Sequence, residues 1–149
     1  IAGGHVAILV NRLRLLDVAS GLDGARVIAW SAGAMALTER LVLFHDTPPQ
    51  GPGNAEVLEP GLGLLPGVVL LPDAKRRLRL EDPVRFAQLA QRFDPATCIA
   101  LDQGDGIDWR LPTNEAGATQ RVRGGTRRLH SDGTVARLPI EAEPERRRW

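Results

Sequence analysis

The chain has 149 residues, of which 43% are hydrophobic and 25% are charged, and its net charge is +1. This composition is ordinary for one globular domain, and it excludes the overall basic field that attracts nucleic acid. No apolar run reaches the roughly 20 residues that cross a bilayer, and no signal peptide is visible. The single cysteine excludes an intrachain disulfide. We therefore expect a cytoplasmic protein with neither nucleic-acid nor membrane partners.

Helical and extended patterns alternate along the chain. In chain order they predict a helix at 5–16, a strand at 25–30, a helix at 31–37, an apolar run at 41–44, a Pro-rich loop at 45–56, a strand at 67–71, a helix at 82–93 with Asp82 as its cap, a strand at 97–101, and short strands at 107–111, 121–123, 127–129 and 134–138. This alternation predicts an α/β fold with a mainly parallel sheet and a small C-terminal antiparallel hairpin. Residues 1–140 form the predicted domain, and residues 141–149 a charged flexible tail.

The first residues are typical of the end of a strand that enters a glycine turn. The chain begins with Ile1, and Gly3 and Gly4 precede the helix predicted at 5–16. We therefore expect that N-terminal elements of the domain lie outside this sequence. Without them, an apolar edge or face of the sheet would be open to association.

The stretch VIAWSAGAM, residues 27–35, places a hydroxyl group between a predicted strand and a predicted helix. Ser31 is compatible with a helix N-cap, whose side-chain oxygen accepts a hydrogen bond from the first turn. It is also compatible with a nucleophile on a strained strand-to-helix turn, which needs small residues two positions before and after the serine. Ala29 and Gly33 occupy those positions, so both interpretations stay open on these residues.

A serine nucleophile also needs donors for an oxyanion and a base for its proton. The N–H of Ala32 would be one donor, and the Gly3–Gly4 turn at a helix start would let a ligand approach a second backbone donor. Of the three histidines, His45 is the best candidate base, since it opens the Pro-rich loop and precedes Asp46. The alternatives are a plain glycine turn and a solvated loop histidine.

A basic run, DAKRRLRL, follows the strand predicted at 67–71. Such a run is either a solvated face or a rim that binds a carboxylate or phosphate, because arginine recognises planar anions with two parallel hydrogen bonds. The sequence has no His/Cys metal spacing and no phosphate-binding glycine pattern. We therefore expect no metal and no cofactor.

Five stretches resemble, in the same order, the serine hydrolase family of dipeptidase E and cyanophycinase. They are AGGHVAIL, VIAWSAGAMAL, GLGLLPGVVLL, RRLRL and CIALDQG, from about residue 2 to about residue 110. The family belongs to the class I glutamine amidotransferase-like proteins, so the resemblance implies a flavodoxin-like α/β fold with further elements before the glycine turn. It also implies that Ser31 is the nucleophile, and that Gly3, Gly4 and the N–H of Ala32 form the oxyanion site.

The chain departs from the family pattern where the catalytic histidine is expected. Asp73 occupies that position, and Arg77 and Arg79 match arginines that follow the family's histidine. A carboxylate with an ordinary pKa of about 4 is a poor base for a serine hydroxyl near pH 7. Either His45 substitutes, with Asp46 where some members carry the acidic member of the triad, or the serine is not activated.

The expected function is that of a peptidase-like serine hydrolase that acts on an amide bond of a small peptide or related substrate. Its activity is impaired if Asp73 cannot serve as the base. The alternatives are a non-catalytic relative that binds a small carboxylate ligand, and a structural domain in a homodimer. A glutamine amidotransferase fits less well, because those enzymes use a cysteine at the elbow and Cys98 lies in a later predicted strand.

Overall fold

The computed structural model describes residues 1–22, 24–45, 56–110 and 119–139. Its elements in chain order are α1 (Val6–Leu15), η1 (Ser20–Leu22), α2 (Ala32–Ala36), β1 (Arg40–Leu43), β2 (Glu56–Pro60), β3 (Val68–Pro72), α3 (Ala74–Arg77), α4 (Pro83–Phe93), β4 (Thr97–Leu101), β5 (Gly106–Arg110), β6 (Thr119–Arg123), β7 (Arg127–Leu129) and β8 (Val135–Arg137). The tail predicted at 141–149 lies outside the described residues, as does the predicted loop between 46 and 55.

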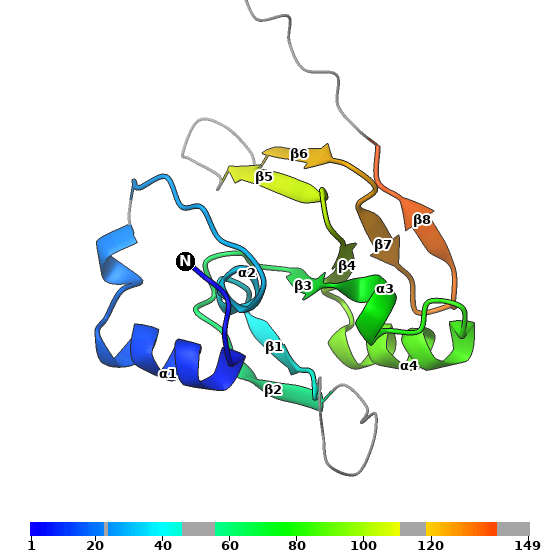
Figure 1. Ribbon diagram of the computed structural model, residues 1–149, viewed down its shortest axis with the longest axis horizontal. Coiled ribbons are helices and arrows are strands. Elements are labelled where there is room, and N and C mark those ends of the chain that lie inside the picture. The colour runs from blue at the N-terminus through cyan, green and yellow to red at the C-terminus, as the bar shows by residue number, and fades with distance from the viewer. Residues whose placement is uncertain (23, 46–55, 111–118, 140–149) are drawn as a thin grey trace, which may run out of the picture.

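A mixed four-stranded sheet with the order β3–β4–β7–β8 forms the centre of the molecule (Figure 1). β3 and β4 are parallel, and β7 and β8 are antiparallel to their neighbours. The α/β class and the C-terminal hairpin are therefore confirmed. Two antiparallel ribbons, β1–β2 and β5–β6, complete the described strands.

Both faces of the β3–β4 pair are buried, and apolar residues occupy both faces from Val68 to Pro72 and from Cys98 to Leu101. One face packs against the helices, and its residues are Val69, Leu71, Cys98 and Ala100. The other face packs against the β5–β6 ribbon, and its residues are Val68, Leu70 and Ile99. Figure 1 shows α4 and the β5–β6 ribbon on opposite sides of these strands. A near-continuous apolar run is what a parallel pair covered on both sides requires.

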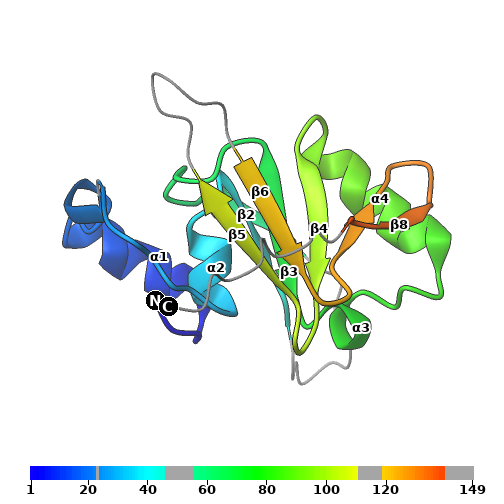
Figure 2. The same cartoon turned by 90° about the horizontal axis from the view of Figure 1, so that it is seen from above.

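The carboxyl ends of β3 and β4 lie at the same edge of the sheet. Pro72 and Leu101 are register partners, so Asp73 and Asp102, which follow them directly, leave the sheet side by side. Figure 2 shows α3 immediately after β3 at this edge. Ligands bind at the carboxyl edge in open α/β sheets, so a site is expected at this edge.

The strand predicted at 25–30 is wrong, although the segment is extended. It belongs to no ladder of the described strands. Among the described residues, the one distant segment that its backbone bonds to is Ile1, whose amine donates to the carbonyl of Ile28 and whose carbonyl accepts from the N–H of Trp30. This is the pattern of a parallel pair, but it is one residue long. Apolar composition predicts an extended backbone, whereas a ladder also needs a partner strand alongside.

Two large apolar side chains of the segment 25–30 are exposed. Ile28 is 72% exposed and Trp30 is 57% exposed.

The helix predicted at 82–93 is confirmed as α4, and the side chain of Asp82 caps it by accepting from the N–H of Arg85 at 3.1 Å. None of the helices described is long and apolar enough to cross a membrane.

Candidate functional site

Ser31 joins the extended segment 25–30 to α2 in a strained conformation. Its φ of 53° and ψ of −129° are rare for a residue with a Cβ atom, and such conformations cost about 1–3 kcal/mol. The side chain of Ser31 makes no capping hydrogen bond, so the N-cap interpretation is wrong. A sharp, strained turn that presents a serine before a helix is what a nucleophile elbow requires.

Gly3 lies directly against Ser31. A Cβ atom at position 3 would lie 3.1 Å from the Cβ of Ser31 and 3.3 Å from its Oγ. Gly4 follows with a φ of 138°, in the region that favours glycine. The structure therefore brings the predicted glycine turn and the predicted nucleophile together, with the backbone of one against the hydroxyl group of the other.

Gly33 allows the elbow to close. A Cβ atom there would lie 2.3 Å from the carbonyl oxygen of Ile1 and 2.7 Å from that of Ala2, so only glycine lets α2 pack against the backbone that leads into the Gly3–Gly4 turn. Ala32 is buried at the first position of α2. In the described part of the chain, the N–H of Ala32 has no hydrogen-bond partner, so it is a candidate donor to an oxyanion.

Asp73 follows β3 in the left-handed conformation, with φ 58° and ψ 43°, and precedes α3. Its carboxylate pairs with the guanidinium of Arg76, and its side chain is 48% exposed. Among the described residues, no hydrogen bond or ion pair joins Asp73 to Ser31. Asp73 therefore stands at the carboxyl edge where the resemblance puts the base, with its charge directed to an arginine of its own helix.

The two arginines of the predicted rim differ in their surroundings. Arg77 donates from Nη1 to the carbonyl of Pro72 at 3.2 Å, and its guanidinium carbon lies 4.9 Å from the ring centroid of Phe44. These contacts tie α3 to the ends of β3 and β1. Arg79 is exposed, with a φ of 47°. Arg79 is thus the better placed of the two to meet a ligand from solvent.

His45 lies beside Glu56 rather than beside Ser31. Its Nε2 is 3.3 Å from Oε1 of Glu56, at the start of β2. In the described ranges no hydrogen bond joins His45 to the hydroxyl of Ser31. Asp46, its predicted orienting partner, lies outside the described residues.

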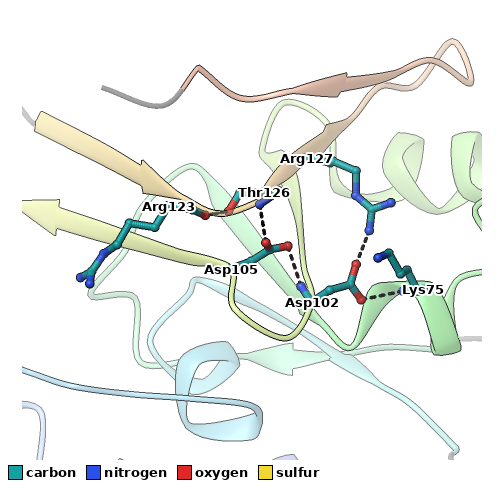
Figure 3. Close-up of polar contacts among 7 residues, drawn as sticks. Lys75, Asp102, Asp105, Arg123, Thr126 and Arg127 are labelled. Carbon is teal, nitrogen blue, oxygen red and sulfur yellow. Dashed lines mark hydrogen bonds and ion pairs between the residues drawn. The ribbon is translucent and has the colours of Figure 1, made fainter. Parts of the chain in front are cut away.

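A polar network at the end of β4 was not foreseen from the sequence (Figure 3). Asp102 accepts from the N–H of Lys75 at 3.0 Å and pairs with Arg127. Asp105 accepts from the N–H of Asp102 at 2.9 Å and from the N–H of Gly125. The only signal in the sequence was an aspartate directly after a buried strand, while the partners come from distant segments.

Cys98 cannot act as a thiolate nucleophile in this fold. It is the second residue of β4, with 1% of its surface exposed, and burial raises the pKa of its thiol to about 12. The described residues contain no group of three His, Cys, Asp or Glu side chains that could hold a metal ion. Ser31 is therefore the nucleophile candidate that the geometry favours.

No protein-family model and no curated protein matches this chain. The functional interpretation therefore depends on the sequence motifs and on the geometry around Ser31.

Proposed function

We propose that this chain is a flavodoxin-like domain of the dipeptidase E and cyanophycinase type, in which Ser31 attacks an amide carbonyl of a small peptide or related substrate. One observation carries the proposal: Ser31 has a strained backbone, with φ 53° and ψ −129°, and its hydroxyl lies against Gly3. Strain of this kind persists only where the surrounding structure enforces it, and it gathers at functional sites.

The proposed reaction is acyl transfer through the serine. Oγ of Ser31 forms a bond to the carbonyl carbon while its proton passes to a base, and the same proton then goes to the amine as the C–N bond breaks. Water hydrolyses the resulting ester, giving its proton to the base and restoring the serine. The N–H of Ala32 and the Gly3–Gly4 turn would hold the negative oxygen of the intermediate.

Asp73 is the base that the resemblance places in this reaction. A carboxylate is a weak base for a hydroxyl near neutral pH, and the carboxylate of Asp73 is already paired with Arg76. When the base of a serine hydrolase is missing, the oxyanion site and substrate binding supply most of what remains. We therefore propose hydrolase ancestry with slow turnover in this chain.

The second candidate is a non-catalytic relative that binds a small carboxylate ligand. It is favoured by the absence, among the described residues, of any histidine in hydrogen-bond contact with Ser31. In that case the glycine turn and the exposed Arg79 would hold the ligand, with Ser31 as a hydrogen-bonding group. Thermal stabilisation of the parent chain by a short acidic peptide that it does not cleave, together with no labelling of Ser31 by a fluorophosphonate, would support this candidate.

A fluorophosphonate probe tests the proposal, since it reacts with an activated serine. We expect slow labelling of the parent chain, none of Ser31→Ala, and faster labelling of Asp73→His, because an imidazole has a pKa suited to the task. His45→Ala is the matched variant, and loss of labelling there would make His45 the base instead of Asp73. If neither the parent nor Asp73→His reacts, Ser31 is not a nucleophile in this chain.

A further inference from the structure

We propose that Asp102, held by Arg127, is a positioning residue that fixes the first turn of α3 and, through it, residue 73. The inference rests on the proposed function in one respect only, which is that residue 73 acts as the base. The anchoring of α3 by Asp102 stands on its own contacts and can be measured separately.

The ion pair of Asp102 and Arg127 is far more buried than that of Asp108 and Arg123. The side chains of Asp102 and Arg127 are 12% and 21% exposed, whereas those of Asp108 and Arg123 are 56% and 67% exposed. A buried charge is tolerated when it is paired and its remaining lone pairs accept hydrogen bonds. Asp102 meets this condition through Arg127 and Lys75, so its carboxylate has one fixed orientation.

The contact with Lys75 is the one that reaches the candidate site (Figure 3). One carboxylate oxygen of Asp102 accepts from the N–H of Lys75, two residues after Asp73, and the other pairs with Arg127 of β7. The carboxylate thus connects the segment after β3 to a strand on the far side of β4. Asp105 fixes the backbone of Asp102 itself by accepting from its N–H.

The segment that carries Asp73 needs such an anchor. α3 spans only Ala74–Arg77, and a helix of one turn is unstable without tertiary contacts. Asp73 also has a left-handed backbone, with φ 58°, which aspartate adopts more readily than most residues but still less readily than the right-handed one. The hydrogen bond from the N–H of Lys75 to Asp102 opposes the unwinding of α3 and holds the backbone of residue 73. It therefore fixes the position from which the side chain of residue 73 extends.

Amide hydrogen exchange of the full chain tests the anchor without reference to activity. In Asp102→Ala, we expect the protection of the Lys75 amide to fall at least about 10-fold more than that of Leu89 and Ala90 in α4, because local opening no longer breaks a hydrogen bond. Asp102→Asn keeps an acceptor oxygen and should restore much of the protection. Asp108→Asn, which disrupts the exposed ion pair with Arg123, should change the protection of neither Lys75 nor α4. If Asp102→Ala lowers the protection of Lys75 and of α4 equally, or lowers neither, the proposal is overturned.

The role toward residue 73 is tested in the Asp73→His background, by the pH dependence of labelling with the fluorophosphonate. We expect Asp102→Ala to lower the plateau rate about 10-fold, since small displacements of a base are costly, and Asp102→Asn to return most of it. If Asp102→Ala leaves the labelling rate of Asp73→His unchanged although the Lys75 amide loses protection, the positioning role is refuted. If Ser31 is unreactive in every variant while the exchange contrast holds, the proposed function fails and the anchor stands.

Discussion

Gly3 faces the side chain of Ser31 so closely that a Cβ atom at position 3 would be crowded, although the two residues belong to different segments. A Cβ atom at position 3 would lie 3.1 Å from the Cβ of Ser31 and 3.3 Å from its Oγ. These distances are tight enough that one of the two residues would have to shift. The position of the hydroxyl therefore depends on the absence of a side chain at position 3.

Gly3→Ala should slow labelling of Ser31 by the fluorophosphonate about 10-fold, because a displacement of a few tenths of an ångström at the nucleophile disturbs its alignment. The thermal transition should move little, since Gly3 is exposed. Gly21→Ala is the control, because a Cβ atom at Gly21 meets nothing within 4 Å. Equal labelling rates for the two variants would show that the hydroxyl is not positioned by this contact.

Gly33→Ala should destabilise the chain by about 3 kcal/mol, at the upper end of what overpacking costs. The added Cβ atom would lie 2.3 Å from the carbonyl oxygen of Ile1 and 2.8 Å from its carbonyl carbon, and backbone atoms cannot move aside as a flexible side chain can. Gly106→Ala, where a Cβ atom meets nothing within 4 Å, is the matched variant. The urea midpoint of Gly33→Ala should lie below that of Gly106→Ala. Coincident midpoints would contradict the close packing of α2 on Ile1.

Elements whose signals are local could be predicted from the sequence. The capping aspartate and first-position proline of α4 lie beside the helix they start, and the uninterrupted apolar runs of β3 and β4 reflect their burial on both faces. At the elbow, the sequence predicts only that small residues, Ala29 and Gly33, flank Ser31. The strained backbone angles of Ser31 distinguish an elbow from a helix cap, and they come from the structure.

Features that depend on distant partners could not be predicted. The segment 25–30 has the composition of a strand, but the sequence does not say that, among the described residues, Ile1 is the one distant residue that bonds to its backbone. β2 was missed, because its pairing with β1 decides its structure and its own pattern is weak. Asp102 had no visible role, since its partner Arg127 lies on another strand.

Cys98 should make the stability of the chain fall at alkaline pH. Burial raises the pKa of its thiol from 9.0 to about 12, so the folded state keeps a proton that the unfolded chain releases. The contribution of Cys98 is complete below pH 9 and is lost between pH 9 and about 12, with a slope that approaches about 1.4 kcal/mol per pH unit. The chain has no tyrosine and a single lysine, so its composition suits a measurement of this slope.

Urea unfolding at several pH values between 9 and 11 measures this slope. Cys98→Ala should be less stable at pH 7 because of the cavity it leaves, but it should lose most of the alkaline slope. The thiol of the folded parent chain should also be inert to a disulfide reagent at pH 8 and react only as the chain unfolds. Rapid reaction in the folded state, or an unchanged slope in Cys98→Ala, would contradict the burial of this thiol.

Ser31→Gly should stabilise the chain while it removes the nucleophile. The angles of Ser31, φ 53° and ψ −129°, mirror an ordinary extended conformation, which glycine adopts as readily as the unmirrored one. Relief of about 1–3 kcal/mol of strain exceeds the roughly 0.5–1 kcal/mol that the flexibility of glycine costs. The net gain of about 1 kcal/mol should raise the melting temperature by roughly 3 °C. Ser31→Ala keeps the Cβ atom and therefore the strain, so it should lose labelling without this gain. Calorimetry of the parent and the two variants decides the matter, because equal melting temperatures for Ser31→Gly and Ser31→Ala would mean that no strain is stored at the elbow.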